Sequence, residues 1–223
     1  MTETPAVRMR RIRAAAAEMD VVLQPGTVHA LLRYLDAMLA QNEQVNLTAI
    51  RDRAAAEVLH VLDSIALARC ELAWSDAVDL GSGNGFPAVA VHLLGRAANP
   101  TARTTCVERT GKKCRAIGAA LAAAEIEGID VRNVDATQWP TLDASVRERF
   151  DLVTARALAA PAEVARLARP LLSRRGSLVL WLEADAQPPA VLPGALHRVG
   201  WEPYELPEPA PRERRLAIYE RVS

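Results

Sequence analysis

The first quarter of the chain has the hydrophobic spacing of α-helices. From Val28 to Leu39 apolar side chains recur every three or four residues, which predicts an amphipathic helix with one buried stripe. Thr27 fits the N-cap position of that helix, and the polar segment 41–44 is expected to end it. A second apolar period predicts another helix over 53–69.

Beyond residue 76 short apolar runs alternate with helical patterns. The runs predict five strands, over 77–80, 104–107, 129–134, 150–154 and 177–181. The segments between them predict helices, over 87–94, 112–124 and 161–168. This alternation predicts an α/β fold of βαβ units with a mostly parallel sheet. Two apolar runs in the tail, 196–201 and 214–219, have only a proline-rich loop between them and predict an antiparallel end to the sheet.

The composition is that of an ordinary globular protein. The chain has 223 residues, of which 50% are hydrophobic and 24% charged. That length suffices for one sizeable core but not for a second independent domain. We therefore expect a single domain over 1–223, with a helical N-terminal extension (1–70) and an α/β core (76–223).

Charge and cysteine usage exclude several classes of function. The formal net charge is zero, so no global field indicates a nucleic-acid binder, although basic residues cluster locally at 8–13, 109–115 and 212–215. The three cysteines show no CxxC spacing, so we expect no metal site and no disulfide framework. No segment approaches the roughly 20 apolar residues of a membrane span. No apolar run follows the basic N-terminus, so we expect no signal peptide. We expect a cytoplasmic protein with no membrane partner.

A glycine turn follows the first predicted strand. Gly81, Gly83 and Gly85 come directly after Asp79 and Leu80 and precede a helix, while Glu108 ends the next strand. This arrangement is the nucleotide-binding crevice of a doubly wound sheet. Glycines let the backbone turn tightly beside a ligand, and a carboxylate such as Glu108 can accept hydrogen bonds from ribose hydroxyls.

The residue at position 86 indicates which nucleotide is bound. A dinucleotide fingerprint has its third glycine there, whereas this chain has Phe86. The pattern Gly81-x-Gly83-x-Gly85 is typical of S-adenosylmethionine, which carries no pyrophosphate. We therefore expect S-adenosylmethionine as cofactor, with Phe86 packed against it.

The residues after the fourth predicted strand limit the methyl acceptor. Thr154-Ala155-Arg156-Ala157 is not the Asn/Asp-Pro-Pro-aromatic set that holds an exocyclic amine. The chain also has no Pro-Cys pair to attack a pyrimidine ring. A ring nitrogen with a free lone pair, such as guanine N7, needs neither device. The pattern is consistent with this acceptor and leaves others open.

Five segments resemble the RsmG (GidB) family of 16S ribosomal RNA guanine-N7 methyltransferases, and the resemblance extends from about Leu31 to Leu180. In chain order the segments are Asn46-Leu47-Thr48-Ala49-Ile50-Arg51-Asp52, His60-Val61-Leu62-Asp63-Ser64, the glycine segment from Asp79 to Pro87, Glu108 to Lys113, and Thr154 to Ala157. The resemblance implies a Rossmann-like class I S-adenosylmethionine methyltransferase with N-terminal helices. It implies transfer of a methyl group to guanine N7 in small-subunit ribosomal RNA.

The resemblance also assigns site residues. The predicted cofactor-binding residues are Gly81, Ser82, Gly83, Gly85, Phe86, Glu108, Val134, Asp135 and Arg156. Val134 and Asp135 would hold the adenine, and Arg156 would meet the cofactor carboxylate or an RNA phosphate. The candidate catalytic residues are Arg156 and His60. The candidate RNA-binding residues are Asn46, Arg51, Lys112, Lys113 and Arg115.

The role of His60 and Asp63 and the form of the RNA substrate stay open in the sequence. His60 and Asp63 share a helix side, so they form either a hydrogen-bonded structural pair or part of the catalytic or RNA-binding site. The expected partner is small-subunit ribosomal RNA or the assembled small subunit, bound by a monomer.

The chain departs from the family pattern at a few positions. Asn84 stands where Pro is usual, Ala88 where Gly is usual, and Leu182-Glu183 where Lys-Gly is typical. An acidic residue is unsuited to an RNA phosphate. The alternative of a paralogue that methylates a small molecule or a protein therefore stays open.

Overall fold

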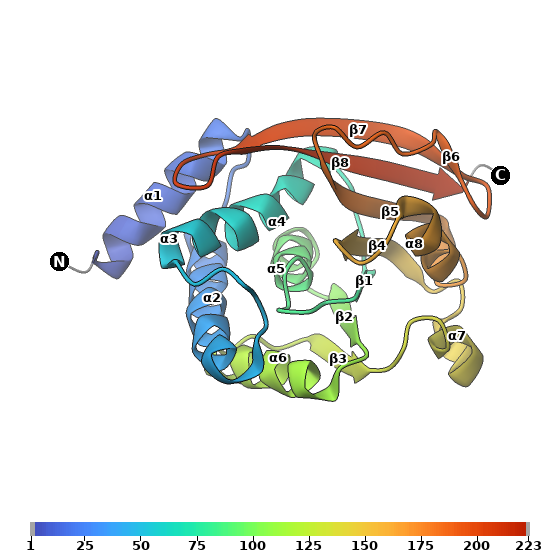
Figure 1. Cartoon of the computed structure of the whole chain (residues 1–223), viewed down its shortest axis with the longest axis horizontal. Coiled ribbons are helices and arrows are strands. Elements are labelled where there is room, and N and C mark those ends of the chain that lie inside the picture. The colour runs from blue at the N-terminus through green and yellow to red at the C-terminus, as the bar shows by residue number, and fades with distance from the viewer. Residues whose placement is uncertain (1–2, 222–223) are drawn as a thin grey trace.

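A computed structural model describes residues 3–221 as helices packed around one eight-stranded sheet (Figure 1). The strand order is β3-β2-β1-β4-β5-β8-β7-β6, in which β1 to β5 are parallel and β6 to β8 antiparallel. The strands are β1 (Asp76–Leu80), β2 (Arg103–Glu108), β3 (Ile129–Asn133), β4 (Phe150–Arg156), β5 (Leu172–Glu183), β6 (Val191–Leu192), β7 (Leu196–Leu206) and β8 (Arg212–Arg221). The predicted α/β fold with an antiparallel C-terminal end is confirmed.

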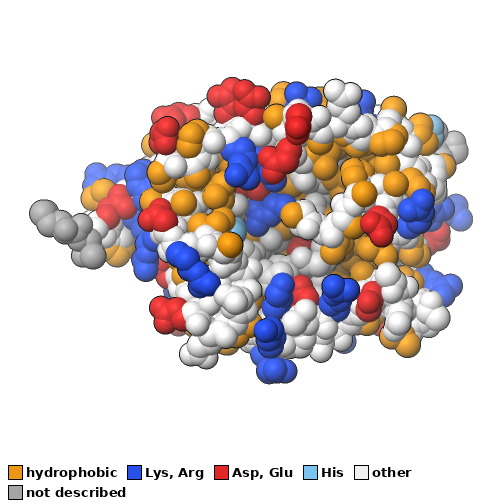
Figure 2. All heavy atoms as spheres, in the orientation of Figure 1, with side chains coloured by type: hydrophobic (Ala, Val, Ile, Leu, Met, Phe, Trp, Pro, Cys, Tyr) orange, Lys and Arg blue, Asp and Glu red, His pale blue; other side chains and the backbone are white. Residues whose placement is uncertain are grey.

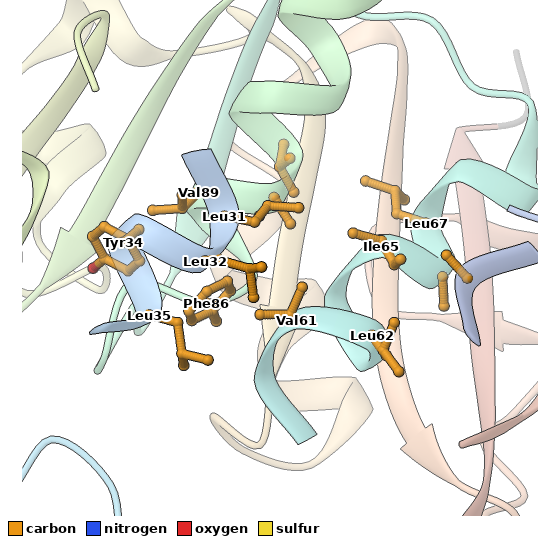
Figure 3. Close-up of a cluster of buried hydrophobic side chains, with 14 of the residues drawn as sticks. Leu31, Leu32, Tyr34, Leu35, Val61, Leu62, Ile65, Leu67, Phe86 and Val89 are labelled. Carbon is orange, nitrogen blue, oxygen red and sulfur yellow. The ribbon is translucent and has the colours of Figure 1, made fainter. Parts of the chain in front are cut away.

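Helices cover both faces of the sheet. They are α1 (Pro5–Glu18), α2 (Pro25–Val45), α3 (Arg53–Ala56), α4 (Asp63–Ile65), α5 (Ala88–Ala98), α6 (Gly111–Ala123), α7 (Trp139–Leu142) and α8 (Pro161–Ala168), with short 3₁₀ turns η2 (Ala66–Cys70) and η3 (Ala144–Val146). One buried cluster joins α1, α2, α5 and α6 to the sheet, and the other joins α7 and α8 to its opposite face. The N-terminal helices therefore share a core with the α/β unit. Figure 3 shows Leu31 and Leu35 of α2 facing Val61, Ile65 and Phe86 in this core.

Both predicted ends of the helix α2 were wrong. The helix α2 begins at Pro25 after Gln24, not after Thr27, because proline suits a first helical position, where no N–H is needed. It also continues through the polar segment 41–44, because Asn42 is buried against the following loop. The helix ends at Val45, because the next residue, the C-cap Asn46, has a left-handed backbone (φ 42°) that breaks the repeat.

The predicted helix over 53–69 changes its winding along its length. A π-helical segment, η1 (Glu57–Leu62), separates α3 from α4. A π turn holds more residues than an α turn, so His60 and Asp63 do not face a common partner. Such segments are rare and concentrate at functional sites.

Candidate cofactor pocket and its supporting network

A cavity of about 580 Å³ opens at the carboxyl ends of β1, β2 and β4. Its walls include every predicted cofactor-binding residue except Gly85; those residues are Gly81, Ser82, Gly83, Phe86, Glu108, Val134, Asp135 and Arg156. In a doubly wound sheet, ligands bind at the carboxyl edge of the strands. The structure therefore gathers residues from four separate segments into one pocket.

The glycine loop (Gly81–Gly85) takes a conformation that side chains disfavour. All three glycines have positive φ, 72°, 53° and 88° in chain order. A Cβ on Gly85 would lie 1.8 Å from the hydroxyl oxygen of Tyr34, which donates to Asn84 O at 2.9 Å. Gly85 thus serves the contact between the loop and α2 rather than the wall of the cavity.

Glu108 is held in a fixed orientation beside this loop. Its Oε2 accepts the N–H of Gly83 at 3.1 Å, and its Oε1 accepts the N–H of Thr110 at 2.8 Å. Each carboxylate oxygen can still accept a second hydrogen bond. The carboxylate is therefore ready to receive the paired hydroxyls of a ribose.

Asp79 lies beneath the loop and is 1% exposed. Its Oδ1 accepts the Thr154 hydroxyl at 2.7 Å, whereas its Oδ2 has no hydrogen-bond partner among residues 3–221. Burial raises the pKa of this carboxyl to about 6, although Thr154 opposes the shift. An unpartnered buried acceptor at this point suits a site built for a polar ligand.

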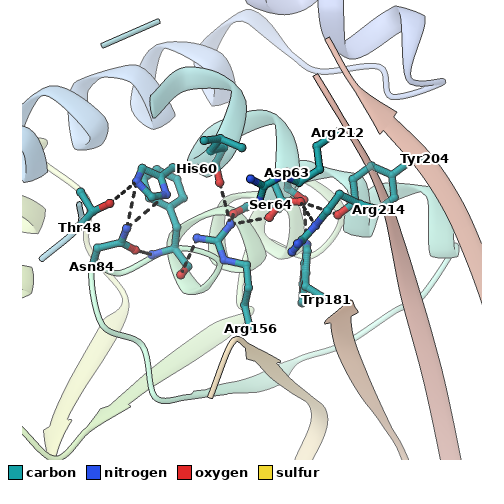
Figure 4. Close-up of polar contacts among 12 residues, drawn as sticks. Thr48, His60, Asp63, Ser64, Asn84, Arg156, Trp181, Tyr204, Arg212 and Arg214 are labelled. Carbon is teal, nitrogen blue, oxygen red and sulfur yellow. Dashed lines mark hydrogen bonds and ion pairs between the residues drawn. The ribbon is translucent and has the colours of Figure 1, made fainter. Parts of the chain in front are cut away.

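His60 lies behind the cavity wall rather than in it. Its ring stacks on Phe86 with centroids 5.9 Å apart, and its nitrogens contact Thr48 and Asn84 (Figure 4). Burial and the nearby Arg156 charge lower the pKa of His60 to about 3. The imidazole is therefore neutral at physiological pH. Its hydrogen-bond partners among residues 3–221 are Thr48 and Asn84, so it does not bond directly to Asp63.

Asp63 is instead the partner of two arginines. Its Oδ2 accepts from Arg156 Nη1 at 2.7 Å, and its Oδ1 lies 3.3 Å from Arg214 Nε (Figure 4). The Tyr204 hydroxyl donates to Oδ1 at 2.6 Å, and Trp181 Nε1 donates to the Asp63 carbonyl at 2.8 Å. One buried carboxylate thus joins the N-terminal helices, the pocket and the C-terminal strands.

Arg156 lines the cavity, but its guanidinium is already engaged. Besides Asp63 it donates to the carbonyls of Leu59 at 3.1 Å and Phe86 at 3.2 Å. Its charge is therefore largely balanced within the fold, and its geometry fixes the start of α5 relative to the π-helical segment.

The unusual Glu183 has a counter-ion. It pairs with Arg214 and lies 3.7 Å from Arg212, on the neighbouring strand β8. Arg214 is the residue that also approaches Asp63. The acidic side chain therefore balances a cation of the C-terminal hairpin.

The candidate RNA-binding residues lie on two segments near the cavity. Lys112, Lys113 and Arg115 occupy the first turns of α6, and Lys113 lines the cavity. Figure 2 shows Lys and Arg side chains gathered over the part of this face where α6 lies. Arg51 donates to Asn46 Oδ1 at 2.9 Å, so these two exposed residues form one polar group on the 46–51 loop.

The N-terminal basic cluster is partly internal. Arg8 and Arg11 of α1 both bind Glu57, which is 1% exposed, and Arg8 also binds Asp36 at 2.6 Å. These two cations therefore dock α1 onto the π-helical segment, and Arg8 is nearly buried in the process.

Several pocket and support residues escaped the sequence analysis. Arg109, Thr110 and Leu158 line the cavity, and Tyr204 and Arg214 hold Asp63. Leu158 could have been found, because it follows Arg156 by two residues after a parallel strand. Tyr204 gave no signal, and Arg214 was noted only as part of the basic cluster 212–215, since both lie more than 140 residues from Asp63.

Metal-binding groups and membrane-spanning helices were also sought among the described residues. Among residues 3–221 no group of three or more His, Cys, Asp or Glu side chains is placed to hold a metal ion. Within the same range, no helix combines the length and the apolar character needed to cross a membrane.

The cavity fits a nucleoside with an amino-acid tail. Glu108 offers acceptors for the ribose, and the Val134–Asp135 pair offers an apolar surface beside a polar edge. Asp79 supports the loop from beneath and does not itself line the cavity. This fold and site define the class I S-adenosylmethionine-dependent methyltransferases.

The comparisons agree with that class. The fold is similar to that of TrmN from Thermus thermophilus, with 17% identity, a TM-score of 0.52, and coverage of 73% of this chain and 48% of that one. It is also similar to a mutant of MtNAS in complex with S-adenosylmethionine, with 16% identity, a TM-score of 0.51, and coverage of 96% and 78%. At these identities the likeness concerns the fold alone.

Sequence comparison narrows the class to one family. Residues 27–187 match the GidB family, described as rRNA small subunit methyltransferase G. The ribosomal RNA small subunit methyltransferase G of Chloroflexus aggregans is 36% identical over 198 residues, which cover 86% of this chain and 80% of the relative. The protein of that name from Geobacter sulfurreducens is 30% identical, with coverage of 86% and 85%. The chain belongs to this family.

Proposed function

We propose that the protein transfers a methyl group from S-adenosylmethionine to N7 of a guanine in small-subunit ribosomal RNA. The observation that carries the proposal is the cavity in which Glu108 and the glycine loop face Val134 and Asp135, with Lys113 beside them. Family membership supports small-subunit ribosomal RNA as the substrate. The preference for guanine N7 rests on the resemblance of the five sequence segments.

The cavity residues bind and align, and no proton transfer is required of them. When bound, S-adenosylmethionine supplies an electrophilic methyl group, which the N7 lone pair takes while the electrons of the S–C bond remain on sulfur. Because N7 carries no proton, a general base is unnecessary. Alignment of the reacting atoms then supplies much of the rate.

The two candidate catalytic residues act in this account by positioning. His60 is neutral and separated from the cavity by Phe86 and Asn84, so it does not transfer a proton. Arg156 fixes the carbonyl of Phe86 and the carboxylate of Asp63. Together they keep the glycine loop and the helix after it in place.

The acidic residue at position 183 no longer favours a different substrate. Glu183 is the counter-ion of Arg214, so its charge is not presented alone to an RNA phosphate. The alternative of a small-molecule or protein methyltransferase loses the sequence feature that motivated it.

The remaining expectations concern the domain organisation, the oligomeric state, the location and the RNA contacts. We infer that residues 1–223 act as one domain, because α1 and α2 share a core with the sheet. We expect the protein to act as a monomer, and a ribosomal substrate implies a cytoplasmic location. Lys112, Lys113, Arg115, Asn46 and Arg51 are proposed as the RNA contacts.

The test is transfer of labelled methyl groups to small ribosomal subunits that lack guanine-N7 methylation, with naked ribosomal RNA alongside. We expect label in RNA and none in ribosomal protein. A Lys112→Ala/Lys113→Ala variant should lose transfer, and an Arg96→Ala/Arg103→Ala variant, altered at the opposite edge of the sheet, should keep it. Label confined to protein would overturn the proposal.

A further inference from the structure

One buried side chain connects the 46–51 loop to the glycine loop. The Nε2 atom of His60 lies 3.2 Å from the hydroxyl oxygen of Thr48, and its Nδ1 atom lies 3.3 Å from Nδ2 of Asn84 (Figure 4). His60 and Asn84 are 5% and 7% exposed, so bulk water cannot readily replace these contacts.

The surrounding hydrogen bonds fix the orientation of the Asn84 amide toward His60. Asn84 Oδ1 accepts the N–H of Phe86 at 3.0 Å, so the Nδ2 group of Asn84 faces His60 and can only donate. This Nδ2 group lies 3.3 Å from Nδ1 of His60 and 3.4 Å from its Nε2. When Nδ1, the nearer nitrogen, accepts from Asn84, the Nε2–H of His60 donates to Thr48. The three side chains therefore form one continuous hydrogen-bonded link around a neutral imidazole.

At one end the link reaches the loop proposed to contact RNA. Asn42 Oδ1 accepts the N–H groups of Leu47 and Thr48, at 2.6 and 2.9 Å, and so shapes this loop. The same loop carries the exposed pair of Asn46 and Arg51. Thr48 lies between these two residues in the same loop.

At the other end the link reaches the cofactor pocket. Asn84 belongs to the glycine loop, and the Tyr34 hydroxyl holds its carbonyl at 2.9 Å. Thr48 itself does not line the cavity.

We propose that His60 is a positioning residue that couples the 46–51 loop to the glycine loop, so that RNA and S-adenosylmethionine strengthen each other's binding. The RNA side of the coupling rests on the proposed function, whereas the cofactor side does not. Thermodynamic linkage requires the effect to be reciprocal. Such coupling is demonstrated when the effects of two substitutions on binding free energy do not add.

The cofactor side is tested without RNA, by calorimetric titration of S-adenosylmethionine. Thr48→Val removes the contact of this hydroxyl with His60 and the bond that it accepts from the Ile50 N–H at 3.1 Å. It should weaken binding about fivefold, although Thr48 is outside the cavity. Thr48→Ser should restore the affinity, and Thr101→Val, which removes a hydroxyl at the opposite edge of the sheet, should not change it. In an Asn84→Ala background, Thr48→Val should add less than twofold. Wild-type affinity in Thr48→Val, or fully additive effects, would overturn the coupling.

The RNA side is tested by repeating the titration with saturating small-subunit ribosomal RNA. RNA should tighten cofactor binding at least fivefold in the wild type and less than twofold in His60→Ala. An equal effect of RNA in both proteins contradicts the proposal. If the wild type binds no ribosomal RNA, the proposed function fails. The comparison of Thr48→Val alone and in the Asn84→Ala background then decides whether the two loops are coupled.

Discussion

Asp63 and Arg156 meet across the junction between the N-terminal helices and the sheet, with Oδ2 and Nη1 2.7 Å apart. Both side chains are nearly buried, and Asp63 is the one carboxylate paired with Arg156 among residues 3–221. The pair is 93 residues apart in the sequence, yet it fixes the wall of the cofactor pocket.

Removing the charge of Asp63 should be costly. Asp63→Asn leaves the Arg156 cation without its counter-ion, which should lower the free energy of unfolding by about 3 to 5 kcal/mol. Denaturant titration measures this loss. Tyr204→Phe is the matched control, because it removes one hydrogen bond to the same carboxylate and should cost only about 1 kcal/mol. Equal, small effects of both changes would contradict this role for the ion pair.

Asp79 should make the cofactor-free protein less stable as pH rises. Its pKa is about 6 in the folded protein and 3.8 when unperturbed, so the folded state holds the proton more tightly. Its contribution to stability is therefore complete below pH 3.8 and is lost as pH rises to 6, by about 3 kcal/mol. Urea titrations should show the stability of Asp79→Asn rising by about 2.4 kcal/mol relative to wild type between pH 4 and pH 7. A difference independent of pH would exclude the buried carboxylate as the cause.

A methyl group at position 85 should disrupt the pocket, whereas one at position 118 should not. The Cβ of Gly85→Ala would collide with Tyr34 on a backbone of φ 88°, which should cost about 2 to 4 kcal/mol. The Cβ of Gly118→Ala, in the middle of α6, would meet no atom within 4 Å, so this change should raise the free energy of unfolding by about 0.5 to 1 kcal/mol. Thermal denaturation of both variants makes the comparison. Similar losses in the two would refute the close approach of Tyr34.

Neutralising Glu183 should affect stability slightly and RNA methylation little. Glu183→Gln weakens a partly exposed ion pair with Arg214, so the loss of stability should stay below about 1 kcal/mol. Methyl transfer to ribosomal subunits should stay within twofold of wild type. A tenfold gain in transfer would show that the acidic residue opposes RNA after all.

Periodicity and motif spacing predicted most of the fold. The alternation of short apolar runs with helices gave the parallel strands β1 to β5, and the absence of a helix near residue 205 gave the antiparallel end. The two-residue strand β6 and the four-residue helix α7 are too short to produce a period. The π-helical segment also escaped prediction, because its extra residue per turn depends on tertiary contacts such as that between Arg8 and Glu57.

The walls of the candidate site were easier to predict than its supports. Gly81, Glu108 and Asp135 each follow a predicted strand, and parallel topology brings strand ends together at one edge. Tyr204 and Arg214 reach Asp63 only because the C-terminal hairpin folds back over the N-terminal helices. No local pattern carries that contact.

The most direct test of the central claim is the identity of the methylated nucleoside. Small ribosomal subunits without guanine-N7 methylation are incubated with the protein and labelled S-adenosylmethionine, and the RNA is then digested to nucleosides and also cleaved at 7-methylguanosine. We predict labelled 7-methylguanosine at one position of the small-subunit RNA, and none with Glu108→Ala. Label in any other nucleoside, or no label in RNA while cofactor binding is intact, would contradict the account.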